Sequence, residues 1–107
     1  MIEVVYNRKY HRVTVRGHAH SGEAGHDLVC AAASILAHTI GAAVTNLHAD
    51  KKVHRPVLRM VSGDAEVSCT PYNRYKASVT LMFDTVCGGF ELLARDFPEN
   101  ISYELRG

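Results

Sequence analysis

Cysteine is scarce in this sequence of 107 residues, and its three copies lie far apart, at positions 30, 69 and 87. An odd number of distant cysteines does not suit the disulfide framework of a small secreted domain, and it is typical of a protein kept in a reducing cytosol. The first residues, MIEVVYNRKY, lack the basic segment and apolar run of a signal peptide. No apolar stretch approaches the ~20 residues that a membrane-spanning helix needs. We therefore expect a cytoplasmic protein without a membrane partner.

Net charge is also small, because 12 Lys and Arg residues oppose 11 Asp and Glu residues. The resulting charge of +1 argues against a dedicated nucleic-acid binder. A short basic cluster does occur, formed by Lys51, Lys52, Arg55 and Arg59. We interpret this cluster as solvated surface and expect no direct nucleic-acid binding. Hydrophobic residues make up 47% of the chain, which is enough for the core of a single domain over residues 1–107.

The pattern of apolar residues predicts two long helices and five strands. Alternation and β-branched residues predict strands at 2–7, 10–16, 57–62, 65–70 and about 101–105. Helical spacing runs from Leu28 to Leu47 and over about 73–97, where Pro98 ends the second helix. The order β-β-α-β-β-α-β predicts an α/β fold of the α+β sandwich type. In it, two long helices pack on a small mixed or antiparallel sheet.

A glycine-rich segment separates the second strand from the first helix. Periodicity disappears over residues 17–25, and Gly17, Gly22 and Gly25 fall within this segment, which predicts a flexible loop. Asp27 follows at the position expected for the N-cap of the helix. On a helical wheel the bulky aliphatic residues centre on one side, and a second stripe lies on the other: Cys30, Ser34, Ala37 and Gly41.

Cys30 is thus predicted in the first turn of the helix, away from its main apolar face. The unpaired N–H groups and the positive dipole end of a helix favour a thiolate, which is the nucleophilic form of cysteine. A general base must come from a neighbouring histidine. His18 directly follows the second strand, and His26 lies four residues before Cys30. From the residues alone, His18 and His26 are equal candidates.

The segment from Gly17 to Ser34 reads GHAHSGEAGHDLVCAAAS. It resembles the signature G-H-A-x-x-G-x-x-G-x-D-x-V-C-A-A-x-S of the ribosomal-processing cysteine protease (Prp) family, with every fixed position present. The resemblance implies that Cys30 is the nucleophile and His18 the base. It also implies supporting roles for Asp27 and Ser34, and a flexible loop that contains Gly17, Gly22 and Gly25. His20 and His26 occupy variable positions, so the resemblance assigns them no catalytic role.

What the resemblance implies about function is specific. Members of the family are dimeric bacterial cysteine endopeptidases that remove the N-terminal extension of a large-subunit ribosomal protein, a step needed for ribosome assembly. The expected substrate partner is therefore a ribosomal protein precursor, cut after a hydrophobic residue, and the expected state is a homodimer. Neither a cofactor nor a metal is implied.

Two other functions remain open at this point. The side chains of His18, His20, His26 and Cys30 could form a zinc site, although a glycine-rich loop does not suit a rigid one. A non-catalytic ribosome-associated module would use the basic cluster instead. Simpler structural roles are also open for individual residues, because Asp27 could serve only as a cap and Ser34 could pack beneath another element. We expect Cys69 and Cys87 in the core, and the Gly88-Gly89 pair at a tight helix crossing.

Overall fold

The computed structural model describes residues 1–18 and 26–107, and for His26 and Asp27 it describes the backbone alone. The predicted flexible loop therefore falls outside the described residues, Gly22 and Gly25 included, and only Gly17 at its start can be placed. His20 and the side chain of His26 also lie outside the described residues.

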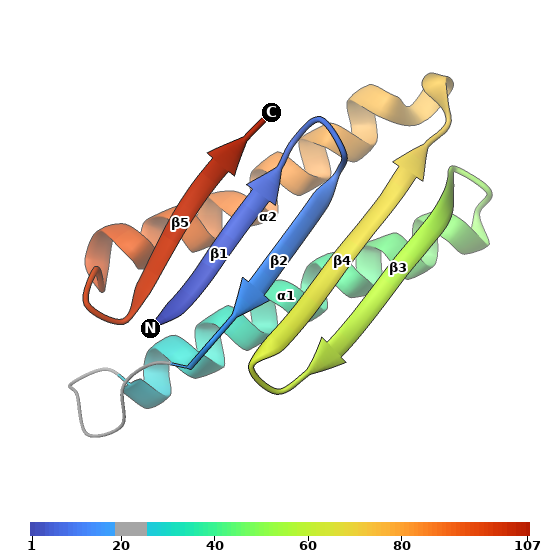
Figure 1. Cartoon of the computed structure of the whole chain (residues 1–107). Helices are drawn as coiled ribbons and strands as arrows, with labels where there is room; N and C mark the ends of the chain where they lie inside the picture. The colour runs from blue at the N-terminus through green and yellow to red at the C-terminus, as the bar shows by residue number, and fades with distance from the viewer. Residues whose placement is uncertain (19–25) are drawn as a thin grey trace.

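Five strands form one mixed sheet in the order β3-β4-β2-β1-β5 (Figure 1). The N-terminal hairpin consists of β1 (Ile2–Asn7) and β2 (Arg12–Arg16). A second antiparallel hairpin consists of β3 (Val53–Val61) and β4 (Asp64–Pro71), and β4 also pairs with β2. The last strand, β5 (Ile101–Arg106), lies parallel to β1 and completes the sheet.

Two long helices cover one face of this sheet (Figure 1). The first, α1 (His26–Ala49), connects β2 to β3, and the second, α2 (Lys76–Asp96), connects β4 to β5. A 3₁₀ turn at Asn73–Tyr75 precedes α2, whose C-cap residue is Phe97, just before the predicted stop at Pro98. The predicted element order and two-layer architecture are confirmed.

The core fills the space between the helices and the covered face of the sheet. Alternate residues of β1 point into it, as the two-residue repeat of a strand requires, so that Ile2, Val4 and Tyr6 are all buried. The Tyr6 ring stacks on Phe83 of α2 with 5.9 Å between ring centroids. Burial of these rings and aliphatic side chains supplies the main favourable term in folding.

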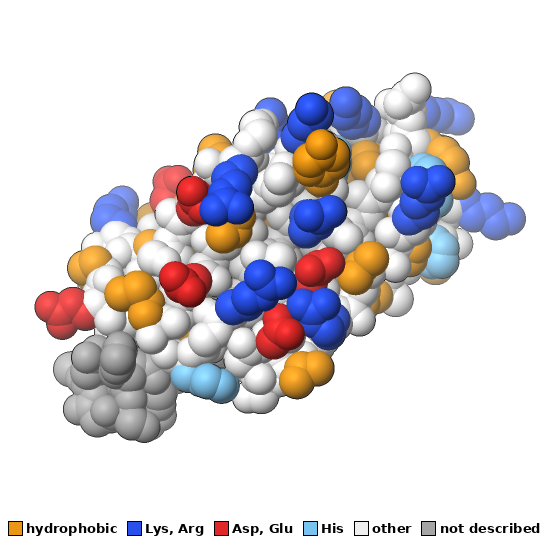
Figure 2. Space-filling view, viewed as in Figure 1, with side chains coloured by type: hydrophobic (Ala, Val, Ile, Leu, Met, Phe, Trp, Pro, Cys, Tyr) orange, Lys and Arg blue, Asp and Glu red, His pale blue; other side chains and the backbone are white. Residues whose placement is uncertain are grey.

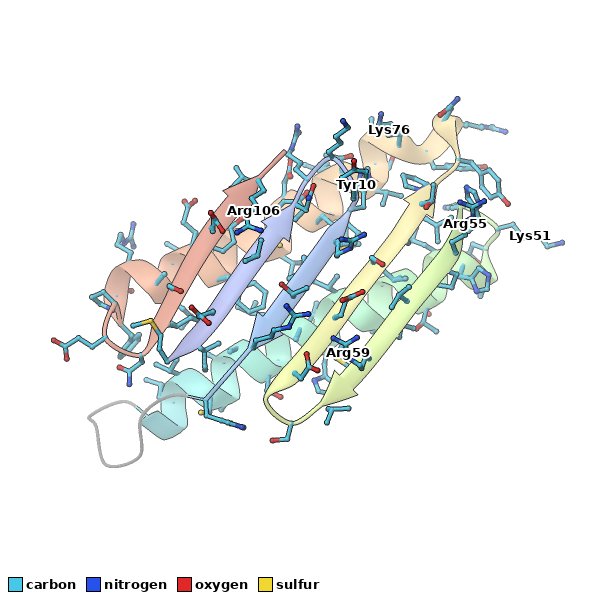
Figure 3. All side chains as sticks on the ribbon, viewed as in Figure 1. Tyr10, Lys51, Arg55, Arg59, Lys76 and Arg106 are labelled. Carbon is cyan, nitrogen blue, oxygen red and sulfur yellow. The ribbon has the colours of Figure 1, made fainter. Side chains whose placement is uncertain are left out.

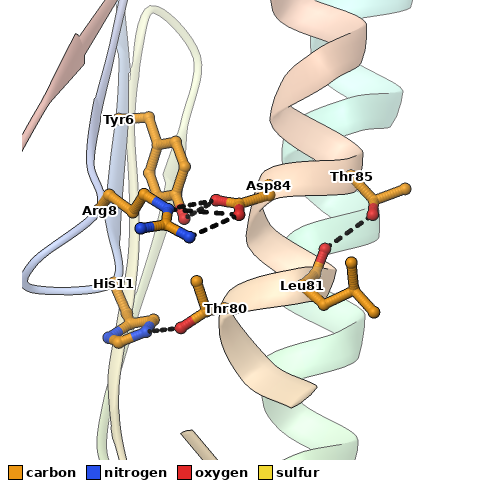
Figure 4. A network of polar contacts seen from close by, with 7 residues as sticks. All are labelled: Tyr6, Arg8, His11, Thr80, Leu81, Asp84 and Thr85. Carbon is orange, nitrogen blue, oxygen red and sulfur yellow. Dashed lines mark hydrogen bonds and ion pairs between the residues drawn. The ribbon is translucent and has the colours of Figure 1, made fainter. Parts of the chain in front are cut away.

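A polar network joins the N-terminal hairpin to α2 above this core (Figure 4). The Tyr6 hydroxyl donates to Asp84 at 2.8 Å, and Arg8 pairs with the same carboxylate at 3.0 Å. The Arg8 guanidinium, which hydrogen-bonds to Asp84, lowers the pKa of that carboxyl, so the group stays ionised and accepts both bonds. His11 lies beside Thr80, with 2.7 Å between Nε2 and Oγ1. The hairpin is thereby fixed in position on α2.

The face of α1 that packs on the sheet differs from the predicted one. Leu28 and Ile35, which were expected among the core residues, are 61% and 63% exposed. Ala37 and Gly41 of the predicted outer stripe are buried instead, and an added Cβ at Gly41 would come within 2.8 Å of Met60 Cε on β3. The helical wheel predicted the wrong buried face because residues 28–49 contain no Asp, Glu, Lys or Arg to mark the outer face.

That same composition has a second consequence. By length and composition alone, Leu28–Ala49 and Asn73–Asp96 are apolar enough to cross a membrane, so the expectation that no stretch approaches this limit was too strong. In the structure each helix packs one face into the core, as helices of a two-layer domain do.

The third strand is also longer than predicted. It begins at Val53, whereas the predicted start was residue 57. A register shift between His54 and Val57 interrupts its pairing with β4, and Arg55 has a positive φ of 53°. Pro56 lies inside this irregular stretch. Because proline cannot donate a ladder hydrogen bond, its presence argued against a strand before residue 57.

Gly89 of α2 lies against α1, as expected for a close helix crossing. An added Cβ there would come within 2.8 Å of Leu36, a larger residue than those of the predicted small stripe. Gly88 has open space around it, and nothing in the structure explains why glycine is needed there.

Candidate active site

The end of β2, the β3–β4 turn and the first half of α1 lie toward the same end of the molecule (Figure 1). Residues of these three segments line a cleft of about 310 Å³. Cys30 and His18 both line it. The structure thus brings together the two residues that the sequence signature marks as reactive. The other lining residues are Ile2, Val15, Gly17, Ala33, Ser34, Ala37, His38, Met60, Val61, Ser62, Gly63, Asp64 and Ala65.

Cys30 is half-buried on α1, with its side chain between the cleft and the core. Because the helix begins at His26, Cys30 is its fifth residue and lies just past the first turn, not within it. The N–H groups without helical partners belong to the first four residues, and the dipole effect decreases over the first turn. Cys30 therefore lies at the limit of the region in which the helix end acts.

Asp27 lies inside the first turn of α1, one residue after the helix begins, so it does not occupy the predicted N-cap position. Assigned helix ends vary by one or two residues, and the difference is of that size. Its side chain is outside the described part of the structure, and its supporting role stays a prediction.

The other two cysteines are buried, as predicted. Cys69 lies on β4 and Cys87 on α2. Burial raises the pKa of Cys69 to about 11 and that of Cys87 to about 12, because a thiolate loses its hydration in an apolar environment. Both thiols therefore stay protonated and unreactive at neutral pH.

His18 is exposed at the mouth of the cleft, directly after Gly17. Gly17 has a positive φ of 92°, and its N–H donates to the carbonyl of Gly63 at 2.9 Å. An added Cβ at Gly17 would overlap the carbonyl oxygen of Met1. Glycine is needed here for both the backbone conformation and the close approach, and together they set the direction in which the chain carries His18.

Gly63, in the β3–β4 turn, lies against the imidazole of His18. An added Cβ at Gly63 would overlap Nε2 of His18 and lie 2.9 Å from Cε1. Gly63 also has a positive φ of 76°. The sequence predicts strands at 57–62 and 65–70 on either side of this glycine and gives no sign that it lies at the site. A turn glycine alone does not indicate which side chain packs on it.

His38 is a further residue of the cleft, and it lies outside the signature segment from Gly17 to Ser34. Its Nδ1 lies 2.9 Å from the carbonyl oxygen of Ser34. Because a carbonyl only accepts, Nδ1 carries the proton and Nε2 of the neutral ring remains an acceptor. The signal that could have found His38 is its spacing, since Cys30, Ser34 and His38 follow one another at steps of four along one helix face.

Ser34 is exposed to the cleft one turn beyond Cys30. The interpretation that it packs beneath another element is therefore wrong. Asp64 also lines the cleft, but Arg59 holds it at 3.0 Å and Arg16 at 3.4 Å. The hydrogen bond from Arg59 lowers the pKa of the Asp64 carboxyl, so this group is a poor proton acceptor. Among the described residues of the cleft, the two histidines are the better bases.

One wall of the cleft is apolar. It offers space for the hydrophobic side chain of a ligand. The wall is formed by the small and aliphatic side chains of Val15, Ala33, Ala37, Met60 and Val61. The described residues contain no group of three or more His, Cys, Asp or Glu side chains that could hold a metal ion. The zinc site considered from the sequence also needs His20 and His26, whose side chains lie outside the described residues.

A family model described as cysteine protease Prp matches residues 1–102. This chain belongs to the cysteine protease Prp family. The resemblance found in the sequence is thereby confirmed, and the Prp signature residues Cys30 and His18 both line the cleft. No curated protein matches the chain.

Solved structures share the fold along the whole Prp-family chain. SMU.848 from Streptococcus mutans is 26% identical with a TM-score of 0.66, and the match covers 98% of this chain and 91% of that one. Two structures are of an essential ribosomal processing protease Prp from S. aureus. The one with a covalently linked product peptide is 24% identical (TM-score 0.65, coverage 99% and 100%), and the one with a substrate peptide is 20% identical (TM-score 0.63, coverage 98% and 97%).

The burial of the three thiols predicts their order of reaction with iodoacetamide. At neutral pH Cys30 should be alkylated at least about 10-fold faster than Cys69 or Cys87, because only ionised and accessible thiols react. Peptide mass spectrometry after timed labelling measures the three rates, and labelling in denaturant is the control that all three can react. Equal rates in the folded protein would contradict an activated nucleophile at Cys30.

Proposed function

We propose that this chain is a cysteine endopeptidase that removes the N-terminal extension of a large-subunit ribosomal protein. The observation that carries the proposal is the shared cleft of His18 and Cys30. Family membership supports the reaction type, and the S. aureus structures with a substrate and a covalently linked product peptide support an extended peptide as substrate. The apolar wall supports a hydrophobic residue before the cut.

In the proposed reaction His18 accepts the thiol proton of Cys30, and the thiolate attacks the scissile carbonyl carbon. The tetrahedral oxyanion then collapses, the C–N bond breaks, and the imidazolium of His18 protonates the leaving amine. Water, deprotonated by His18, hydrolyses the thioester and releases the new carboxylate. Backbone N–H groups at the start of α1 are our candidates for the oxyanion donors, each worth ~2.7–4 kcal/mol if correctly placed.

Cys30 lies past the first helical turn, where the effect of the helix dipole decreases. We infer that a nearby imidazole therefore does more than the helix end to activate the thiol. The nearby bases are His18, held against Gly63, and His38, whose ring bonds to the carbonyl of Ser34. His38 stands on the same rigid helix as Cys30, eight residues along, which is about two turns and ~12 Å away. That separation favours His18 as the base and leaves His38 to contact the peptide.

Removing each candidate group should separate these roles. Cys30→Ala should abolish cleavage of the unprocessed ribosomal protein, and His18→Ala should lower kcat/KM at least about 100-fold, the scale of general base catalysis. His38→Gln should cost less than about 10-fold. Mass spectrometry of the products gives both the cleavage position and the rate. A loss in His38→Gln as large as that in His18→Ala would reverse the assignment of the base.

Substitution of Gly63 should displace the imidazole of His18, which lies against this glycine. Gly63→Ala adds a Cβ where the imidazole lies and strains a left-handed residue by ~1–2 kcal/mol. Gly63→Asn adds the same Cβ, but asparagine tolerates this backbone conformation better. Both variants should lose about 100-fold in kcat/KM, while Gly63→Asn keeps more stability by urea denaturation.

The matched control is Gly88→Ala, a helical glycine with open space around it, which should leave cleavage unchanged. If Gly63→Asn cleaves as fast as the parent protein, the contact between Gly63 and His18 does not position the base.

We also propose that the active protein is a homodimer, and that the outer face of α1 forms the interface. Leu28 and Ile35 are largely exposed on a helix that carries no charged residue from position 28 to 49. Large exposed apolar residues on an uncharged helix face are typical of an interface between subunits. A second copy of this chain could bury them, because a two-fold contact matches identical faces.

Introducing a charge at Ile35 should therefore disrupt the dimer. Ile35→Glu is expected to convert the protein to a monomer in light scattering after size-exclusion chromatography, because a buried carboxylate without a partner is costly. Leu105→Glu on strand β5 is the control, since Leu105 is 56% exposed and tests the edge strand as the alternative interface. Dissociation by Leu105→Glu alone would move the interface to β5.

The cytoplasm remains the proposed compartment. All three cysteines are free in the structure, and two of them are buried on different elements. A reducing environment suits a nucleophilic thiol that must not be oxidised.

A further inference from the structure

The small net charge of the chain conceals a strong separation of charge. Three short segments, 8–12, 50–55 and 72–76, contain eight of the twelve Lys and Arg residues and one of the eleven Asp and Glu residues, Asp50. We call the surface that these segments form the basic end. Its cations are Arg8, Lys9, Arg12, Lys51, Lys52, Arg55, Arg74 and Lys76.

Backbone contacts hold these segments together in space. The N–H of Tyr72 donates to the carbonyl of Lys52 at 3.2 Å, and that of Cys69 donates to His11 at 3.2 Å. In Figure 3, Tyr10, Lys51, Arg55 and Lys76 lie together at the end of the molecule away from the start of α1. Figure 2 shows blue side chains gathered over that end. The cleft with Cys30 is therefore at the opposite end of a molecule about 45 Å long.

Most of these cations are available to a partner. Arg8 pairs with Asp84, and the remaining seven take part in no ion pair among the described residues. Lys9, Arg12, Lys51, Arg55 and Lys76 are all exposed. Uncompensated cations on one surface attract a polyanion at a rate and affinity that depend on salt.

The backbone of the basic end is held in an unfavourable conformation. Three non-glycine residues of the described chain have positive φ, and all three lie here: His11 at 48°, Lys51 at 59° and Arg55 at 53°. Each such residue costs ~1–2 kcal/mol. Arg55 lies at the register shift of edge strand β3, directly before Pro56. This backbone conformation places the exposed Arg55 at the edge of the sheet.

Aromatic rings lie among the cations. Tyr10 is 56% exposed, with Lys9 Nζ 5.7 Å and Arg12 Cζ 5.8 Å from its ring centroid. Tyr72, 48% exposed, stacks on His54 with 4.6 Å between ring centroids. Exposed rings flanked by cations are the groups on which the bases of single-stranded RNA stack while its phosphates are neutralised.

We propose that the basic end binds single-stranded RNA. Its phosphates contact Lys51, Arg55 and Lys76, and its bases stack on Tyr10 and Tyr72. RNA is favoured over an acidic protein because the exposed ring faces offer stacking surfaces that nucleic-acid bases use and carboxylates do not. It is favoured over a membrane because the patch has no continuous apolar face. The proposal departs from our expectation of no nucleic-acid binding, which considered only the total charge. It does not depend on the protease assignment, since the cleft at the opposite end stays open to a peptide.

Fluorescence anisotropy with a labelled single-stranded RNA of about 12 nucleotides tests the proposal. We expect a Kd in about the micromolar range at low salt, and a slope of log K against log salt of about −3 for some four neutralised phosphates. Arg55→Glu and Lys76→Glu should each weaken binding about 10-fold and reduce the slope by about one. Tyr10→Ala should weaken binding without changing the slope, and Tyr10→Phe should not.

Arg95→Glu is the charge-matched control, because Arg95 is exposed near the end of α2, away from the basic end. It should change RNA affinity less than twofold, and circular dichroism with a peptide cleavage assay checks that every variant is folded. The proposal fails if RNA does not bind at low salt, or if Arg95→Glu weakens binding as much as Arg55→Glu. It also fails if polyglutamate or anionic vesicles compete as well as RNA at equal charge, since the partner would then be an acidic protein or a lipid surface.

Discussion

The candidate site depends on the close contact between two turns at one end of the sheet. The N–H of Gly17 donates to the carbonyl of Gly63, and the imidazole of His18 lies against the same glycine. This contact ties the end of β2 to the β3–β4 turn and holds His18 at the mouth of the cleft that Cys30 lines. An added Cβ at Gly63 would overlap the His18 imidazole, and one at Gly17 would overlap the carbonyl oxygen of Met1. Residues of both hairpins and of α1 thus line the cleft that contains His18 and Cys30.

The relation between the helix and its cysteine bears on the mechanism. Cys30 comes after the first turn of α1, where the effect of the unpaired N–H groups has begun to decrease. A thiol at that position needs a cation or a base nearby to become a good nucleophile at neutral pH, and the side chains of His18 and His38 line the same cleft. The helix contributes rigidity, because it fixes the position of the sulfur relative to the apolar wall of the cleft.

Much of the fold could be predicted because strand alternation and helix length are local signals. The long signature around Cys30 predicted the family, and the two residues that it marks, His18 and Cys30, line one cleft. The rest depended on tertiary contacts. The buried face of α1 was predicted wrongly because an uncharged, alanine-rich helix offers no polar side to orient it, and the start of β3 was hidden by Pro56. Gly63 and His38 belong to the site through packing and helical spacing, respectively, and neither is marked by the signature. The glycine-rich loop stays a prediction.

The distribution of charge shows why a total is a poor guide to partners. A chain with a net charge of +1 would bind no polyanion if its charges were mixed evenly, since each cation would be screened by a neighbouring carboxylate. Here the acids of the described structure lie mostly on the sheet face, on the end of α2 and near the cleft, and the cations crowd the far end. Such a molecule has two surfaces with different chemistry, about as far apart as its length allows. A partner that approaches the basic end would therefore leave the cleft uncovered, so anchoring the protein and cutting a peptide are compatible in one complex.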